Sequence, residues 1–238
     1  MRLGIFFVFM LVSISTVAGT WKDDFNDGDL EGWSMTKAIW QGPLMPGEGS
    51  WSIKDGVVIG GDGVGSTLHS LWVSEGMPWS DYAAEVSIKL PKPLEIQEWA
   101  IVGLFIMPEE GKSSGFNVRN IQGSVFTEAF IYMHPATMIH ISTRPFKIED
   151  NRWYRLKLKV VERIDHENGI IQCFIDDEMM FQFQGYRKGA PGFYTYQCAA
   201  MFDDFVVTGL GIPDGGPGLK AVTPHIKLAT TWANIKKQ

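Results

Sequence analysis

The sequence has few cysteines, no block of basic residues and, in its body, no convincing helical periodicity. It has 238 residues, a net charge of −6 and only 2 Cys. Without a Lys/Arg-rich patch, nucleic acid is excluded as a partner. After the amino-terminal segment no apolar run is long enough to span a bilayer. We therefore expect a mature chain without a membrane span.

The common catalytic and metal motifs are also missing. The chain has no Gly-x-Ser-x-Gly elbow and no zinc pattern, and His134 and His140 stand at no recognised metal spacing. The stretch "DDFNDGD" lacks the closing glutamate and flanking helices of an EF-hand. Glu95 and Glu98 fall on opposite faces of a strand. A facing carboxylate pair, which glycosidases need, is not visible, although a pair assembled from separate strands stays open.

The amino terminus predicts export. Arg2 precedes the apolar run "LGIFFVFMLVSISTV", and Val17-Ala18-Gly19 supplies small residues for cleavage. This is typical of a signal peptide over residues 1–19, with an uncleaved anchor as the alternative. The mature protein is then secreted or periplasmic. In such an oxidising compartment Cys173 and Cys198 have two open readings, a disulfide or two buried thiols.

The middle of the chain alternates with a period of two. In "WYRLKLKVV" (153–161) apolar and basic side chains take opposite faces, and "GIIQCFIDDEMMFQF" (169–183) predicts a hairpin turning at Asp176-Asp177-Glu178. "AIVGLFIM" (100–107) is apolar on both faces, so we expect it inside a sheet and covered on both sides. Many strands with Gly/Pro punctuation indicate an all-β fold of two packed antiparallel sheets.

The character of the chain changes after residue 208. "GIPDGGPGLKAVTPHIK" is rich in Gly and Pro, which predicts a linker or an extended surface segment. The final "LATTWANIKKQ" is consistent with a short amphipathic helix or with a disordered tail. We therefore expect one β domain over 20–208, followed by a Gly/Pro-rich linker and carboxy-terminal tail over 209–238.

Two short stretches echo each other at the ends of the expected domain. "KDDFND" (22–27) and "FDDFVV" (202–207) each carry Asp-Asp-Phe. First and last strands are commonly neighbours in such folds, so the two should meet. Strict alternation along the last strand would point either Asp203 or Asp204 toward the apolar side, where a carboxylate needs a hydrogen bond, a cation or a metal. Calcium is one solution, with ligands from Asp24, Asn26, Asp27 and one of the two later aspartates. The alternative is that these acids face water or accept hydrogen bonds from neighbouring backbone amides.

The order of these motifs resembles the concanavalin A-like lectin/glucanase superfamily. "DDFNDGDLEGW", "WSIKDGVVIGG", "WYRLKLKVV" and "GAPGFYTYQCAAMFDDFVV" follow one another as in its laminin G-like and 3-keto-disaccharide hydrolase-type domains, over roughly residues 21–208. The resemblance implies a jelly-roll sandwich of two antiparallel sheets, one of them concave. It also implies a structural calcium where the first and last strands meet. Asp204 matches a ligand position there, with carbonyls near Asp24 and near Gly60 completing the site.

A ligand-binding face is predicted on the stretch "FIYMHPATMIHISTRPF". As a hairpin turning at Pro135-Ala136-Thr137, it places Phe130, Tyr132 and His134 on one face of the incoming strand. His140, Ser142 and Arg144 would share a face of the outgoing strand, and Trp99, Asn117 and Arg119 are further candidates. Rings and planar donors of this kind suit sugars. The alternative is that these residues lie on a solvent-exposed sheet surface that binds no ligand, or that the register of the hairpin differs.

Three functions are consistent with these patterns and with what the resemblance implies. The first is a non-catalytic, calcium-stabilised module that binds glycans or extracellular proteins. The second is a glycan hydrolase of the 3-keto-disaccharide hydrolase type, acting near His134 and His140. The third is a structural or adhesive domain of a larger extracellular assembly. The missing run of carboxylates favours the first and third.

Overall fold

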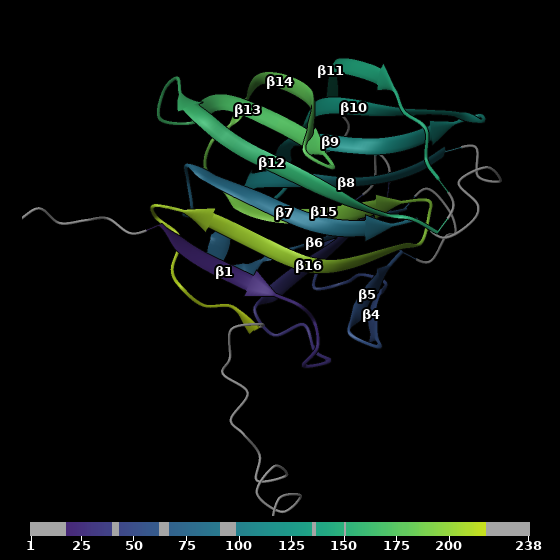
Figure 1. The fold of residues 1–238 in the computed structure, drawn as a ribbon, viewed down its shortest axis with the longest axis horizontal. Helices are drawn as coiled ribbons and strands as arrows, with labels where there is room; N and C mark the ends of the chain where they lie inside the picture. The colour runs from purple at the N-terminus through teal and green to yellow at the C-terminus, as the bar shows by residue number, and fades with distance from the viewer. Residues whose placement is uncertain are drawn as a thin grey trace, which may run out of the picture.

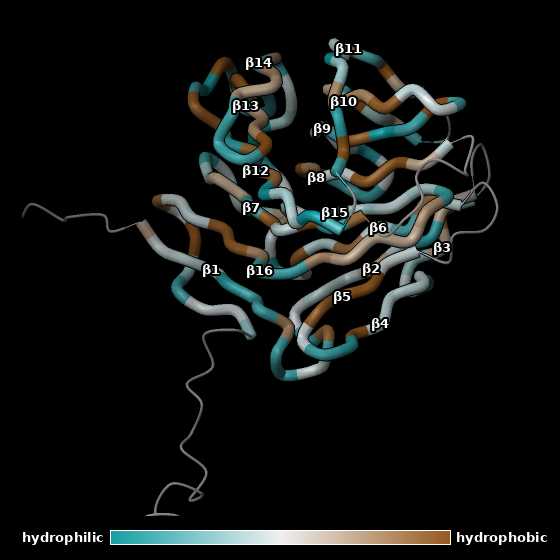
Figure 2. Tube along the Cα trace, turned by 45° about the vertical axis from the view of Figure 1, so that its right-hand side comes forward, coloured by the Kyte–Doolittle hydropathy of each residue, from teal (hydrophilic) through white to brown (hydrophobic). Residues whose placement is uncertain are grey.

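The protein is a sandwich of two antiparallel sheets, each of eight strands. The computed structural model describes residues 18–39, 43–61, 67–90, 99–134, 137–149 and 151–217. Figure 1 shows the two layers, and Figure 2 separates β12, β13 and β14 of one layer from β9, β10 and β11 of the other. The predicted all-β jelly-roll sandwich of two antiparallel sheets is confirmed.

Sheet A follows the order β14-β13-β12-β7-β16-β5-β4, with β1 also pairing with β16. Its strands, in that order and with β1 last, are Glu178–Tyr186, Asn168–Ile175, Trp153–Arg163, Tyr82–Lys89, Ala200–Gly209, Val57–Gly60, Trp51–Lys54 and Gly19–Asp23.

Sheet B follows the order β11-β10-β9-β8-β15-β6-β2-β3. Its strands, in that order, are Thr137–Pro145, Ser124–Met133, Lys112–Ile121, Trp99–Glu109, Ala190–Tyr196, Thr67–Val73, Trp33–Ile39 and Leu44–Pro46; a short 3-10 turn, η1, covers Ser74–Gly76.

The strands of sheet A follow the alternation in their sequence. Tyr154, Leu156, Leu158 and Val160 of β12 are buried, as predicted. The predicted hairpin is confirmed, because β13 and β14 pair on either side of the turn at Asp176-Asp177. Both turn aspartates have positive φ, 49° and 65°. Aspartate tolerates this geometry better than most side chains, and two-residue hairpin turns require it.

The strands at the centre of sheet B are buried on both faces. Every residue from Ala100 to Met107 in β8 is buried, which confirms the prediction for "AIVGLFIM". One face of β8 joins the main core between the sheets, which includes Val102, Leu104 and Ile106. The other face joins a second apolar cluster, which includes Phe105 and Met107. Sheet B therefore has packed side chains on both sides.

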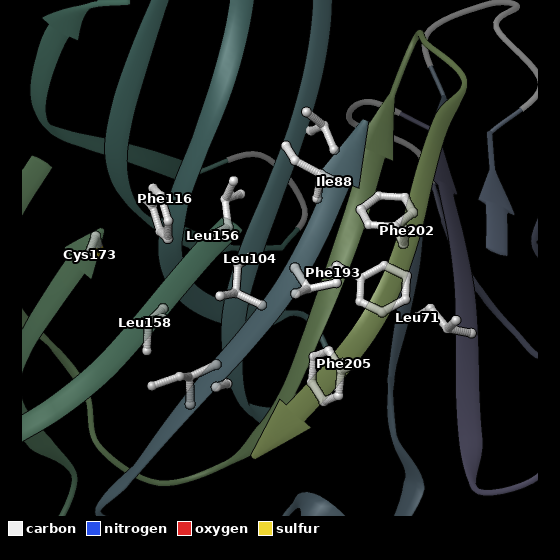
Figure 3. Close-up of a cluster of buried hydrophobic side chains, with 14 of the residues drawn as sticks. Leu71, Ile88, Leu104, Phe116, Leu156, Leu158, Cys173, Phe193, Phe202 and Phe205 are labelled. Atoms are coloured by element: carbon white, nitrogen blue, oxygen red, sulfur yellow. The ribbon is translucent and has the colours of Figure 1, made fainter. Parts of the chain in front are cut away.

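The main core is densest where the two chain ends meet. Phe193 stacks on Phe202, with ring centroids 4.2 Å apart, and Phe205 follows at 5.8 Å from Phe193. Figure 3 shows these three rings in one column between the sheets. Trp33 packs edge-on against Phe205 at 4.9 Å and lies 5.6 Å from Phe25. The phenylalanines of both Asp-Asp-Phe segments thus contact the same tryptophan.

The two echoing segments do meet, as predicted. β1 pairs with β16 in antiparallel register, with Asp23 opposite Phe205, and Figure 1 shows the two strands side by side. The prediction that Asp203 or Asp204 points into the core is wrong, because β16 does not alternate strictly. Its register shifts between Asp203 and Val206, and Asp204 adopts a φ of 50°. This β-bulge turns both Phe202 and Phe205 inward and both aspartates outward.

The inward carboxylate belongs to Asp23 in the first strand. Asp23 is fully buried, and it accepts hydrogen bonds from Trp33 Nε1 at 2.7 Å and from the Phe25 amide at 2.8 Å. Burial raises the pKa of Asp23 to about 6, although both hydrogen bonds lower it. The buried acid is therefore satisfied by protein donors.

Cys173 and Cys198 are free thiols, both buried. Of the two alternatives, a disulfide or two buried thiols, the structure shows the buried thiols. Cys173 lies in the core on β13, and Cys198 Sγ donates to the Ile101 carbonyl at 3.3 Å. Burial raises the pKa of Cys198 to about 12 and that of Cys173 well above its usual value. Neither side chain has the thiolate character on which cysteine reactivity depends.

Residues 209–217 turn back along β1. Gly215 pairs with the first strand through two backbone hydrogen bonds of 3.0 Å, and Ile212 is buried. The predicted signal segment up to residue 17, the hairpin turn at 135–136 and the tail from 218 onward lie outside the described residues. Within the described ranges, no helix is long and apolar enough to cross a membrane.

The stability of the fold should reflect the titration of Asp23. Its folded pKa lies above the unfolded value of 3.8, so its stabilising contribution is fully present below that value and is lost as pH rises through about 6. The loss is on the order of 3 kcal/mol. We therefore compare the free energy of unfolding of the native protein with that of Asp23→Asn. The difference, native minus variant, should fall by about 3 kcal/mol between pH 4 and pH 7.

Denaturant melts across this pH range measure the difference. Asp55→Asn, at an exposed turn with a φ of 54°, is the matched control and should track the native protein. A difference between native protein and Asp23→Asn that does not change with pH would contradict the raised pKa.

Candidate functional site: a cleft on the outer face of sheet B

Sheet B carries a second apolar cluster on the face turned away from the main core. Its buried members are Trp72, Ile101, Phe105, Met107, Phe130, Ala190 and Tyr194. All of them except Ala190 form part of the floor of a cleft of about 490 Å³, to which all eight strands of the sheet contribute. A mostly apolar concave site with a few polar groups is the usual form of a small-molecule pocket. We call this side of sheet B the cleft face.

The strand register sorts the side chains of the cleft face into rows that cross the sheet. One row, here called the polar row, runs from β2 to β10 through Thr36, Ser70, Tyr194, Gly103, Asn117 and Glu128. The rows on either side are mainly aromatic or aliphatic. One contains Trp72, Phe105 and Phe130, and the other contains Leu68, Tyr196 and Ile101. The cleft therefore offers hydrogen-bonding groups along a line between apolar walls.

A glycine at the centre of the polar row makes room for a ring. A Cβ at Gly103 would stand 2.6 Å from Cε1 of Tyr194, so the tyrosine ring lies across the glycine. Tyr194 also packs edge-on against Phe130, with centroids 5.8 Å apart. Burial raises the pKa of Tyr194 far above its usual value, so this side chain remains a neutral phenol. It forms a flat, permanent part of the floor.

The turn between β8 and β9 reaches over to the far side of the cleft. Thr36 Oγ1 on β2 donates to Glu110 Oε1 in this turn at 3.2 Å. Next in the turn, a Cβ at Gly111 would come within 3.3 Å of Leu44 on β3 and 3.0 Å of His134. The sheet therefore curls until its β8–β9 turn meets its opposite edge, and Glu110, Gly111 and Lys112 line the cleft.

A charged network underlies one end of the cleft. Glu128 on β10, whose side chain is 2% exposed, forms an ion pair with Arg119 on β9, which is 6% exposed. The other oxygen of Glu128 contacts Nδ1 of His140 on β11 at 2.5 Å. Asn117 Nδ2 donates to Glu128 and, at 3.1 Å, to the Tyr194 hydroxyl. Burying these charges is tolerable because each has a partner.

The network also fixes the orientation of His140. Since an ionised carboxylate only accepts hydrogen bonds, the Nδ1 atom that contacts Glu128 carries the proton. In the neutral imidazole Nε2 is then an acceptor, on a side chain that is 54% exposed and lines the cleft. Within the described residues, Arg119 Nε and Asn117 Oδ1 are buried without a hydrogen-bond partner. The charged end thus keeps unused hydrogen-bonding capacity.

Three of the five predicted ligand-binding residues line the cleft. Tyr132 and His140 come from the predicted hairpin, and Trp99 comes from the start of β8. Trp99 is 41% exposed and lies over the guanidinium of Arg119, 5.9 Å from Cζ to the ring centroid. His134 does not line the cleft; its amide donates to Gly111, and its ring lies 3.4 Å from the Tyr132 hydroxyl. It supports the rim.

The prediction that Arg144 shares a face with His140 is wrong. The register between β10 and β11 shifts between Ala129 and Phe130, so His140 lies opposite Phe130 but Arg144 lies opposite Thr127. Ala129 and Thr127 point away from the cleft, and Ala129 belongs to the main core. Arg144 instead donates to the Met179 carbonyl of β14 at 3.1 Å, across the gap between the sheets. A bulge reverses the facing of residues beyond it.

Sequence reasoning missed the residue at the centre of the network. Glu128 stands in "VFTEAF", an unremarkable strand pattern. Glu128 and Tyr132 are four residues apart on one strand, so their side chains lie on the same face. This spacing was the one sequence signal that could have placed Glu128 in the site. The partners of Glu128, however, lie on β9 and β11, and Asn117 links the network to Tyr194 on β15; only the register brings these strands together. The cleft residues Trp72, Tyr194 and Tyr196 were missed for the same reason.

The predicted calcium residues are brought together only in part. Burial raises the pKa of Asp203, a hydrogen bond from the Asp204 amide lowers it, and the charges of Asp204 and Asp24 raise it further. Gly60 instead pairs with Ala200 at the start of β16, and Asn26 lies beside Gly56. Across the described ranges no three acidic, histidine or cysteine side chains converge as a metal site. The five-residue calcium set therefore stays a prediction.

Comparison with known proteins identifies the fold but no family. No protein-family model matches the chain, and no curated protein matches it. The carbohydrate-binding module CBM66 from Bacillus subtilis is 14% identical, covering 75% of this chain and 96% of its own at a TM-score of 0.53. The metal-free carbohydrate recognition domain of Emp46p is 12% identical, covering 77% and 90% at 0.54.

The CBM2 module of an evolved Dit protein from the Lactobacillus casei BL23 phage J-1 is 8% identical. It covers 80% of this chain and 95% of its own at a TM-score of 0.54. At such identities the likeness shows the sandwich fold alone. The finer resemblance to laminin G-like and 3-keto-disaccharide hydrolase-type domains stays a prediction.

The buried ion pair should be strongly coupled. We expect Glu128→Leu to lower the free energy of unfolding by about 3 kcal/mol, because it leaves the Arg119 guanidinium buried without its counter-charge. Adding Arg119→Met should recover most of this loss. Denaturant melts of both single variants and the double variant give the coupling energy. If the double variant lost the sum of the single losses, the network would not be a coupled unit.

Proposed function

We propose that the cleft of sheet B binds a carbohydrate and does not cleave it. The observation that carries this proposal is the combination of ring side chains and hydrogen-bonding groups in one cleft: Trp72, Trp99, Tyr132, Tyr194 and Tyr196 with Arg119 and His140. Sugar rings present apolar C–H faces edged by hydroxyls, and such faces stack on aromatic rings. The fold likeness to carbohydrate-binding modules supports the same choice.

The positions of the carboxylates in the cleft favour binding of a glycan over its cleavage. Glycosidases place two carboxyl groups on either side of the scissile bond. Glu128 is buried beneath the floor, where Arg119 and His140 occupy its oxygens. Glu110 accepts a hydrogen bond from Thr36 in the β8–β9 turn. The two carboxylates therefore do not form the facing acid and base that hydrolysis needs. His140 and Arg119 are instead placed to hydrogen-bond a bound ligand.

We further propose that the chain is exported, which suits a glycan-binding module. Arg2, the apolar run that follows it and the small residues up to Gly19 support this. The predicted location is therefore extracellular or periplasmic, with glycans or extracellular proteins as partners.

Binding should depend on the aromatic rim. We expect Trp99→Ala to weaken glycan binding at least about tenfold, because it removes a stacking surface at the mouth of the cleft. Trp153→Ala is the matched control: Trp153 is 37% exposed, lies on sheet A under Lys89 and is not among the residues that line the cleft. Screening on a glycan array followed by titration calorimetry measures both variants. Equal losses in the two variants, or no glycan bound by the native protein, would sink the proposal.

We also propose a weak calcium site restricted to Asp24 and Asp203. Burial is the main cause of the raised pKa of Asp203, and the charges of Asp204 and Asp24 add to it. The Lys22 ammonium, which pairs with Asp24 at 3.9 Å, offsets this repulsion in part, and a cation between Asp24 and Asp203 would relieve the remainder. Calcium at 100 times its dissociation constant should stabilise the fold by about 2.7 kcal/mol relative to chelator. Thermal melts should show this shift in the native protein and in the turn variant Asp177→Asn, but not in Asp203→Asn. An equal shift in all three, or none, would contradict the site.

A further inference from the structure

One row of the cleft face changes character along its length. It runs from β3 to β9 through Leu44, Ala38, Leu68, Tyr196, Ile101 and Arg119, each opposite the next in the strand register. All six side chains line the cleft. The β3, β2 and β6 end is aliphatic, and the β9 end carries Arg119, flanked by the exposed ring of Trp99. We call this set the amphipathic row.

The two ends are too far apart to serve one sugar ring. Leu68 and Arg119 are separated by three strand spacings of about 4.8 Å, or roughly 14 Å across the sheet. The charged end also has His140 with its exposed imidazole and the unpartnered Nε of buried Arg119. A ligand that fills the whole cleft must therefore be polar at one end and apolar at the other.

The aliphatic end gives a second sugar little to bind. Its polar neighbours are the hydroxyls of Thr36 and Ser70 on the next row and the side chains of Glu110 and Lys112 at the β8–β9 turn. The Thr36 hydroxyl is already donated to Glu110, and the Lys112 ammonium is paired with Glu109. Sugar hydroxyls lying over Leu44, Ala38 and Leu68 would lose water and would meet polar groups that are largely paired with one another, which costs free energy. A hydrocarbon chain in the same place would gain from the burial of apolar surface.

We propose that the cleft binds an amphiphilic glycan, in which a sugar carries an alkyl or acyl chain. The sugar lies at Trp99, Arg119 and His140, and the chain lies over Leu68, Ala38 and Leu44 beneath the β8–β9 turn. This inference rests on the proposed carbohydrate binding and names the chemical class of the ligand. The cleft volume of about 490 Å³ is within the range of sites that enclose most of a small ligand.

Titration calorimetry with n-alkyl β-glucosides and β-maltosides, from methyl to octyl and below their micelle concentrations, tests the inference. Tetraethylene glycol octyl ether serves as a probe with the chain but no sugar. We expect affinity to rise about fourfold for each added methylene, and the octyl glycosides to bind at least tenfold more tightly than the ether.

Variants at the aliphatic end give the second measurement. Leu44→Ser and Leu68→Ser should reduce the gain per methylene and weaken the octyl glycoside far more than the methyl glycoside. Leu210→Ser makes the same change at a side chain that is 66% exposed and outside the cleft lining, and it should leave every affinity unchanged.

The outcomes separate the two proposals. Affinity that does not rise with chain length, while Trp99-dependent glycan binding persists, overturns the amphiphile inference alone. Octyl ether that binds as tightly as the octyl glycosides shows that no sugar is recognised, and it overturns carbohydrate binding together with this inference. Failure of every alkyl glycoside to bind also overturns the inference.

Discussion

The fold depends on one irregularity, the bulge at Asp203 and Asp204 in β16. In a strictly alternating strand Phe202 and Phe205 would face opposite sides of the sheet. The bulge turns both rings into the core, where they pack with Phe193. Arg155 stabilises the bulge, because its guanidinium donates to the Asp204 carbonyl at 2.8 Å while its Nε donates to Glu85. The strand that closes the sandwich can therefore pair with β7 and β1 and still fill the core.

The same region explains why a carboxylate is buried in an aromatic cluster. Asp23 lies opposite Phe205 and accepts a hydrogen bond from the indole of Trp33, the ring that contacts both Phe25 and Phe205. A buried acid with two donors orients the tryptophan, at the cost of a raised pKa. The aspartates of the later segment face outward and leave the core to the rings.

The cleft depends on a property that sheet B does not share with an ordinary sandwich layer. Its central strands are apolar on both faces, so the side away from the core carries a second packed cluster. The charged group formed by Arg119, Glu128 and His140 is held at one end of this cluster by mutual pairing. An apolar floor beside a satisfied charged network gives the site two different ends, and this difference distinguishes it from a uniformly polar sugar groove.

The sequence by itself determined several of the strands and the two-sheet class, because alternation, turn residues and double-faced apolar runs are local signals. The meeting of the chain ends followed from the two Asp-Asp-Phe segments, since first and last strands are commonly neighbours in such folds. It also selected Trp99, Tyr132 and His140 as ligand-binding candidates, and all three line the cleft. Only the tertiary structure decided which strands are neighbours, so it alone placed Glu128 between Arg119 and His140. Two bulges, one in β16 and one in β11, also overturned inferences drawn from strict alternation for Asp203, Asp204 and Arg144. A bulge inserts one residue and reverses the facing of those beyond it, and whether it forms depends on the partner strand and the packing, which a single strand's sequence does not contain.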